Sequence, residues 1–228
     1  MATFDIKAQF ENKLNELWDK ATKNFILEPL HSSIARGYAI ESEIEKNSIL
    51  FVSMNPSFVD GKWNNGNQGG NVFYKIPALF DPKGTNNFFN AINLFYNDIK
   101  DSREQFPRLA HHDLLFIRET KQENVLNWKK KYNSFFKEQL DISKRIIIES
   151  EPKLIVVLNA GARELFKEMF GELNIENTLG VRIYPLNDMK TPVLFSGMLS
   201  GGHPLDLGSK ESLQWHIQFI LDNLKYNK

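Results

Sequence analysis

Two apolar runs constrain the fold of this chain more than any other feature. Residues 48–54 and residues 154–158 are almost uninterrupted stretches of large apolar side chains. Such runs are typical of strands buried on both faces, as in a parallel sheet covered by helices. Ligands of such sheets bind outside the carboxyl ends of the strands. The polar residues that follow each strand are therefore candidate site residues.

Apolar residues recur every three or four positions in the segments between these runs, a spacing that predicts amphipathic helices. Helices are expected from Phe10 to Phe25, after the capping residue Thr85, over residues 124–149 as far as Pro152, over residues 160–170 before Gly171, and over residues 211–224. Further strands are expected within residues 109–117 and 193–195, with an edge strand at residues 181–184.

Strands that alternate with helices imply right-handed crossovers and parallel pairing. We therefore expect an α/β fold, a three-layer α/β/α sandwich around a central, mostly parallel sheet of four strands. No linker-like segment divides the chain, so residues 1–228 are expected to form a single domain with an N-terminal helical extension over about residues 1–47.

Composition narrows the function. Lys and Arg total 28 and so do Asp and Glu, which leaves no overall basic field for nucleic acid. A local group of Arg118, Lys121 and Lys129 to Lys131 is most simply a solvated helix face. The lack of cysteine excludes disulfides, thiolate nucleophiles and Cys-ligated zinc or iron–sulfur centres. Without a signal-like start or a long apolar run, we expect a cytoplasmic protein that does not bind membranes, and a monomer.

Two polar residues stand out where apolar strands give way to loops. Asn55 precedes Pro56 and opens a Gly- and Asn-rich loop over residues 55–71. His203 precedes Pro204 in a second loop, after the apolar run at residues 192–197. Prolines restrict the backbone just beyond each side chain, and loops as long as the first are commonly functional. A site built around Asn55 and His203 is the leading hypothesis.

Four short motifs, in order, carry a family resemblance. They are Ser53-Met54-Asn55-Pro56-Ser57, Gly69-Gly70-Asn71-Val72-Phe73-Tyr74, the strand from Pro152 to Leu158, and Gly202-His203-Pro204. Together they resemble the uracil-DNA glycosylase superfamily, most closely its branch with Asn in the first motif.

The resemblance implies a glycosylase that flips a damaged or deaminated base out of DNA, with no cofactor and no metal. Asn55 would position water and His203 would stabilise the leaving base. Phe73 would stack on the base and Asp113 would read its edge. The same comparison assigns Ser53, Met54 and Asn159 to the base pocket, and Pro56, Ser57, Gly202, Pro204, Leu205 and Leu207 to DNA contacts, with Leu205 or Leu207 as the wedge.

The chain departs from the family pattern at three places. Ser53 replaces a glycine, Leu205-Asp206 replaces a serine and a proline, and Asp113 stands where the family commonly has Asn. An amide can donate to uracil O4 and accept from N3–H, whereas an ionised carboxylate only accepts. The identity of the base is therefore open.

Other interpretations of these residues also stay open. Asn159 can cap the helix that begins at Ala160, and Phe73 can be a core residue. His111 and Asp113 can converge as metal ligands, because alternate residues of a strand share a face. His112 lies between them and points to the opposite face. The chain could also be a non-catalytic nucleic-acid or nucleotide-binding module, or a hydrolase of small nucleosides. No lysine in the motifs suggests an amine nucleophile, so hydrolysis alone is the expected glycosylase chemistry.

Overall fold

The computed structural model describes residues 2–58, 70–74, 91–92, 108–172, 174–176, 181–186, 189–200 and 203–223. A six-stranded sheet with the order β6-β4-β7-β10-β9-β8 forms its centre. The first four strands are parallel: β6 (Leu109–Asp113), β4 (Ile49–Ser53), β7 (Leu154–Leu158) and β10 (Met189–Ser196). Antiparallel β9 (Val181–Leu186) and β8 (Asn174–Glu176) complete it.

A mostly parallel central sheet was predicted, and the sheet is mostly parallel, with four parallel strands. The total of four strands was wrong, because β9 and β8 extend the sheet. The segment at residues 181–184 belongs to β9, which lies inside the sheet, and β8 takes the edge. Three residues make β8 too short to stand out as a periodic pattern in the sequence.

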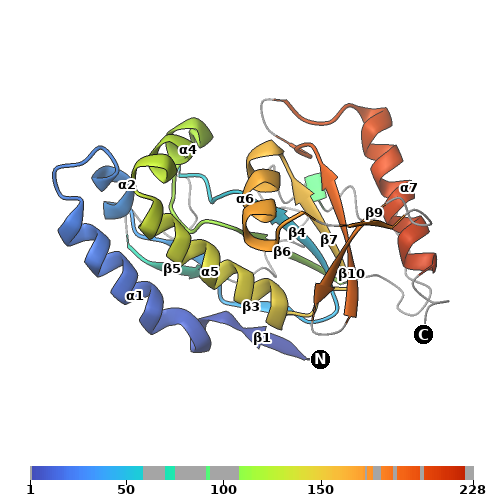
Figure 1. Ribbon diagram of the computed structural model, residues 1–228, viewed down its shortest axis with the longest axis horizontal. Helices are drawn as coiled ribbons and strands as arrows, with labels where there is room; N and C mark the ends of the chain where they lie inside the picture. The colour runs from blue at the N-terminus through green and yellow to red at the C-terminus, as the bar shows by residue number, and fades with distance from the viewer. Residues whose placement is uncertain are drawn as a thin grey trace.

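Helices cover both faces of the sheet (Figure 1). One face packs against α1 (Ile6–Asn24), α5 (Asn133–Glu149) and α6 (Ala160–Phe170) through residues such as Leu50 and Val52. The other packs against α7 (Leu207–Asn223) through residues such as Ile49 and Phe51. Alternating side chains thus enter two hydrophobic clusters, which explains why β4 is apolar along its length. This arrangement is an α/β fold that is compatible with the three layers expected.

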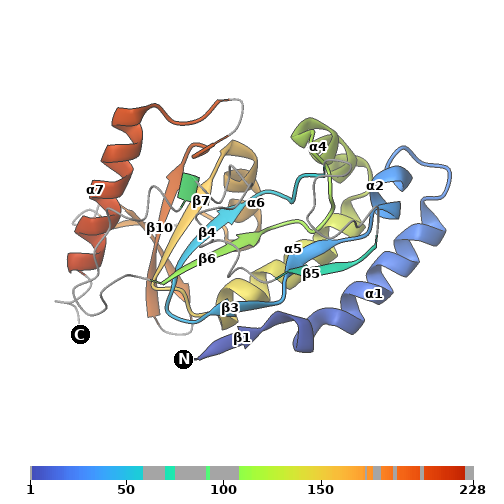
Figure 2. The ribbon, with the colours of Figure 1, turned by 180° about the vertical axis from the view of Figure 1, so that it is seen from behind.

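Residues 2–47 contain strands as well as helices. They form β1 (Thr3–Asp5), α1, α2 (His31–Ala35), β2 (Ala39–Glu41) and β3 (Glu43–Glu45). The interpretation of this segment as a helical extension is therefore incomplete. Strand β2 pairs in parallel with β5 (Val72–Tyr74), and this pair lies beside β6 (Figure 2). Glu41 reaches the centre of the molecule from there.

Gly37 fixes the position of β5. Its φ is +75°, and a side chain on it would collide with the backbone of Gly70, just before β5. Glycine permits both the left-handed backbone and the close approach.

The helix expected over residues 124–149 is two helices, α4 (Gln122–Lys131) and α5, separated at Tyr132. Tyr132 leaves the helical conformation with ψ +44°, and its ring packs on Phe25 while its hydroxyl donates to Glu28. These tertiary contacts interrupt a continuous apolar pattern. The expected helix after Thr85 lies outside the described residues, except for Ala91 and Ile92. Within the described ranges, no helix combines the length and apolar character needed to cross a bilayer.

Candidate functional site

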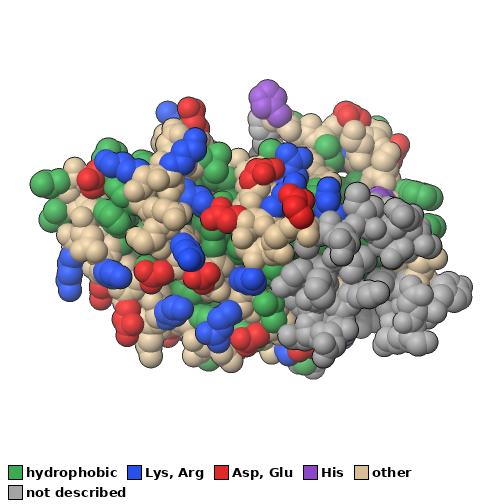
Figure 3. Space-filling model, in the orientation of Figure 1, with side chains coloured by type: hydrophobic (Ala, Val, Ile, Leu, Met, Phe, Trp, Pro, Cys, Tyr) green, Lys and Arg blue, Asp and Glu red, His purple; other side chains and the backbone are tan. Residues whose placement is uncertain are grey.

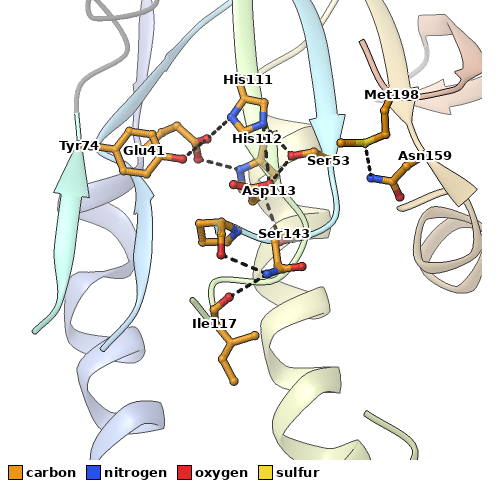
Figure 4. Close-up of polar contacts among 12 residues, drawn as sticks. Glu41, Ser53, Tyr74, His111, His112, Asp113, Ile117, Ser143, Asn159 and Met198 are labelled. Carbon is orange, nitrogen blue, oxygen red and sulfur yellow. Dashed lines mark hydrogen bonds and ion pairs between the residues drawn. The ribbon is translucent and has the colours of Figure 1, made fainter. Parts of the chain in front are cut away.

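A buried polar cluster lies at the carboxyl ends of β4 and β6 (Figure 4). Glu41 comes from β2 and Tyr74 from β5, whereas Ser53 ends β4. The other members come from β6 and α5: His111, His112, Asp113 and Ser143. Burying so many polar groups is costly unless they are hydrogen-bonded to one another.

Glu41 is the centre of the cluster. Its Oε1 accepts from the Tyr74 hydroxyl and from Nδ1 of His111, each at 2.8 Å, and its Oε2 lies 3.2 Å from Nδ1 of His112. Burial alone would raise the pKa of Glu41. The hydrogen bonds and charges of His111 and His112 outweigh it and lower that pKa from 4.5 to about 2. Glu41 is thus a buried carboxylate at neutral pH.

Ser53 connects His111 to Asp113. Its Oγ lies 2.8 Å from Nε2 of His111 and donates a short hydrogen bond to Oδ1 of Asp113. Burial is the largest influence on Asp113 and raises its pKa, although His111 and Ser53 act in the opposite direction. Burial opposes a charge on His111, but Asp113 and Glu41 outweigh it and raise the pKa of that imidazole.

The pleat of β6 sends neighbouring histidines to opposite faces. His111 and Asp113 both meet Ser53, whereas Nε2 of His112 lies 3.1 Å from Oγ of Ser143 on α5. The convergence of His111 and Asp113 is confirmed. Glu41 contacts both histidines because it approaches from beyond the edge strand of the sheet.

Glu41, His111 and Asp113 also bring donor atoms within 4.8 Å of one another, close enough for one divalent cation. Carboxylate and imidazole are suitable ligands, but a cation requires both in unprotonated form. Here Nδ1 of His111 and Oε1 of Glu41 bond to each other, and Asp113 bonds to Ser53. Each of these residues already has a hydrogen-bond partner within the cluster, and we interpret the cluster as a proton-filled network.

Asn55 lies just past β4, and its amide orientation is fixed. Nδ2 donates to the carbonyl oxygens of Glu119 at 2.7 Å, Pro56 at 3.1 Å and Ile117 at 3.4 Å. Only the NH₂ side of an amide can donate, so Oδ1 must point the other way. Oδ1 is buried and has no hydrogen-bond partner within the described part of the chain. A buried acceptor in this state is ready to receive a hydrogen bond from water or a ligand.

Hydrogen bonds to the Glu119 carboxylate stabilise the segment that accepts from Asn55. The Glu119 carboxylate accepts from Ser33 Oγ at 3.0 Å, from Arg36 at 3.1 Å and from the Lys121 amide at 3.0 Å. Burial would raise the pKa of Glu119, but the hydrogen bonds from Lys121 and Ser33 and the charge of Arg36 lower it. The Pro56 carbonyl accepts from the Glu119 amide, and the Pro56 side chain is buried rather than available to DNA.

Phe73 faces away from the cluster. Its ring packs edge-on against Tyr38 at 5.5 Å between centroids and joins the core. The neighbouring Tyr74 points to Glu41 instead, as strand alternation requires. Burial and the Glu41 charge raise the pKa of Tyr74 well above 10, so its hydroxyl remains a donor. Of these two adjacent aromatic residues, Tyr74 rather than Phe73 faces the cluster, and the placement of Phe73 at a base is not supported.

Two further predicted pocket residues have structural roles. Met54 is buried in the core beside Gly161 of α6. Asn159 caps α6, because its Oδ1 accepts from the Ala162 amide at 2.8 Å, and its Nδ2 contacts Met198 Sδ at 3.3 Å. The capping alternative for Asn159 is confirmed.

The motif that contains His203 lies in the connection from β10 to α7. His203 and Pro204 are exposed, and His203 makes no hydrogen bond to any described residue. Leu205 packs against the α7-side cluster and its amide donates to Met198, whereas Leu207 is 73% exposed at the start of α7. Ser57 is exposed, and Gly202 lies outside the described residues.

The basic group noted in the sequence does not form a free patch. Lys129 pairs with Glu168 at 2.7 Å and Lys131 with Glu28 at 2.8 Å, while Arg118 is fully buried. Acidic and basic side chains are interspersed on the face seen in Figure 3. The solvated-helix interpretation holds for Lys131, whose side chain is 60% exposed, but not for Lys129, whose side chain is 16% exposed.

Sequence reasoning missed Glu41, Tyr74 and Ser143. Glu41 follows the apolar pair Ala39-Ile40, a weak strand pattern inside a segment interpreted as helical. The adjacent His111-His112-Asp113 was a visible signal, but it did not identify its partners. No protein-family model matches the chain, and a search of curated proteins finds no significant similarity.

Proposed function

We propose that this protein hydrolyses the N-glycosidic bond of a damaged or deaminated base flipped out of DNA, on a fold of the uracil-DNA glycosylase type. The orientation of Asn55 carries the proposal. An amide oxygen that is fixed, buried and unpaired is suited to hold the attacking water, and three carbonyl contacts prevent the amide from turning over.

The order of the sheet supports the same proposal. Asp113 ends β6, Asn55 follows β4 and the loop of His203 follows β10, and the carboxyl ends of these parallel strands lie along one edge. Side chains alternate along each strand, and Phe51 and Ser53 of β4 pair with His111 and Asp113 of β6. Ser53, His111 and Asp113 therefore face the same side of the sheet as Phe51, which is the α7 side where Leu205 packs. This is the location expected for a ligand of a parallel sheet.

Cleavage of the bond leaves an electron-poor sugar and an anionic base. Asn55 would orient water toward the sugar, and His203 would donate to the oxygen or nitrogen on which the charge develops. His203 is exposed in the absence of DNA, so its approach to the base depends on the bound strand.

The Asn55→Ala and His203→Ala variants should each slow base release by roughly 10²-fold, the typical loss when one oriented group of this kind is removed. Release is measured as alkali-labile sites in oligonucleotides that carry uracil, hypoxanthine, 5-hydroxyuracil or 5-hydroxycytosine. Asn127→Ala, an exposed asparagine on α4, is the matched control and should retain the wild-type rate. Wild-type protein that releases none of these bases would refute hydrolysis and favour a binding module.

A further inference from the structure

The hydrogen-bond network contains one proton whose position is not determined by the neighbouring groups. Glu41 is a carboxylate and can only accept, so Nδ1 of His111 carries hydrogen. The Ser143 hydroxyl donates to the Leu114 carbonyl at 2.7 Å, so Nε2 of His112 donates to Ser143 and Nδ1 of His112 donates to Glu41. Both nitrogens of His112 then donate, as in an imidazolium that balances the Glu41 charge.

On the other face, Ser53 has one hydroxyl hydrogen and two close neighbours that both accept in their unprotonated forms. These are Nε2 of His111 and Oδ1 of Asp113. If His111 donates to Ser53, then Ser53 donates to an ionised Asp113. If Asp113 is protonated on Oδ1, it donates to Ser53, and Ser53 donates to a neutral His111. The two arrangements contain the same atoms and the same total charge, and they differ by a proton moved along the chain.

Loss of that proton is unfavourable. One Ser53 hydrogen would then face two unprotonated acceptors, and one short contact would become a repulsion between lone pairs. The raised pKa of His111 and the raised pKa of Asp113 agree with a proton held jointly by the two residues.

In both arrangements the second carboxyl oxygen of Asp113, Oδ2, carries no proton. In one, Oδ2 belongs to a carboxylate, and in the other it is the carbonyl oxygen of the acid, because the proton is on Oδ1. Oδ2 accepts in either case. It makes no hydrogen bond to a described residue, and Asp113 retains 4% exposure.

We propose that His111, Ser53 and Asp113 share one proton, and that this fixes Oδ2 of Asp113 as a hydrogen-bond acceptor that selects a base presenting an amino N–H in preference to a carbonyl oxygen. The substrate class is then a damaged amino-bearing base such as an oxidised cytosine. This selection rests on the proposed function. An acceptor set against a carbonyl leaves both groups unpaired, which disfavours that base.

Nitrogen-15 NMR of the histidine rings tests the shared proton without any activity. In wild type, Nε2 of His111 should show a shift between the protonated and unprotonated limits, changing little between pH 6 and 8. Ser53→Ala should convert it to one definite protonation state. Ser143→Ala, which removes the equivalent serine of His112, should leave the His111 signal unchanged. A wild-type His111 that titrates fully as an isolated imidazole would overturn the shared proton.

A matched pair of substrates tests the acceptor. The bases 5-hydroxycytosine and 5-hydroxyuracil differ in whether position 4 carries an amino group or a carbonyl oxygen. Wild type should prefer the first by roughly ten- to a hundred-fold. Asp113→Asn, which adds a donor beside the acceptor, should reduce or reverse that preference. Equal release of both bases by wild type would overturn the selection, whereas release of neither base, together with the NMR result above, would refute the proposed function and leave the shared proton established.

Discussion

Glu41 is the residue on which the buried network depends. It is fully buried and accepts from three side chains that come from β5 and β6. A carboxylate can satisfy all three donors at once, which no neutral side chain of the same size can do. Its negative charge faces a ring nitrogen of each histidine, which offsets part of the cost of holding a carboxylate away from water.

The Glu41→Gln variant should lower the free energy of unfolding by about 3–5 kcal/mol, because it leaves buried histidine donors without their countercharge. Chemical denaturation measures the change. Glu151→Gln is the control, since Glu151 pairs with Lys46 at 2.7 Å on the surface and should cost under about 1 kcal/mol. Equal small effects for both variants would contradict the central role of Glu41.

At the scale of elements, the connection from β10 to α7 has two leucines in different environments. Leu205 is held by the core beside Gly197, where a larger residue would collide with its Cδ2. Leu207 is 73% exposed on the first turn of α7. Of the two candidates for a wedge, Leu207 is the one free to enter a duplex, and Leu205 anchors the loop.

The Leu205→Ala variant should therefore reduce stability by about 1–3 kcal/mol through lost apolar burial, with little direct effect on DNA. Leu207→Ala should leave the thermal midpoint unchanged and weaken single-turnover base release from duplex more than from single strands. Leu27→Ala, at a leucine that is 94% exposed between α1 and α2, is the surface control. Unchanged duplex kinetics for Leu207→Ala would show that it is not a wedge.

For the molecule as a whole, the cluster makes stability depend on pH in two directions. The pKa of Glu41 in the folded protein, about 2, is below its ordinary value of 4.5. Its contribution to the stability of the fold is therefore present above pH 4.5 and is lost as pH falls toward 2. The pKa of His111 in the folded protein is raised above 6.5. Its contribution to stability is therefore complete below pH 6.5 and is lost as pH rises through the pKa of the folded state. The raised pKa of Asp113 acts in the same direction as that of His111.

The free energy of unfolding, measured by urea denaturation from pH 3 to pH 9, should fall at both ends of this range. The alkaline loss should begin above about pH 6.5, with a slope of up to ~1.4 kcal/mol per pH unit for one retained proton. Asp113→Asn removes the shared proton, so its alkaline limb should be flatter than that of wild type. An alkaline limb of the same slope in both proteins would argue against joint retention of the proton.

The parallel strands and most of the helices could be predicted because each carries a local signal. Leu50 and Val52 alternate with Ile49 and Phe51 in an apolar run, and Gly171 with φ +76° ends α6 as the sequence indicates. Asn159 was recognisable as a cap for the same reason, since a cap acts within three residues of its own position.

The cluster itself depended on the tertiary structure. Glu41 is 70 residues from His111 in sequence, and Ser53 is 60 residues from Asp113. No local pattern reports such separations, because the hydrogen bonds form only after β2 and β5 have packed beside the edge of the sheet. The sequence determined that Asp113 lies within a strand and that the strand over residues 48–54 is buried on both faces. Only the fold decided that Tyr74 rather than Phe73 faces the cluster, since strand alternation places one residue inward once β5 pairs with β2.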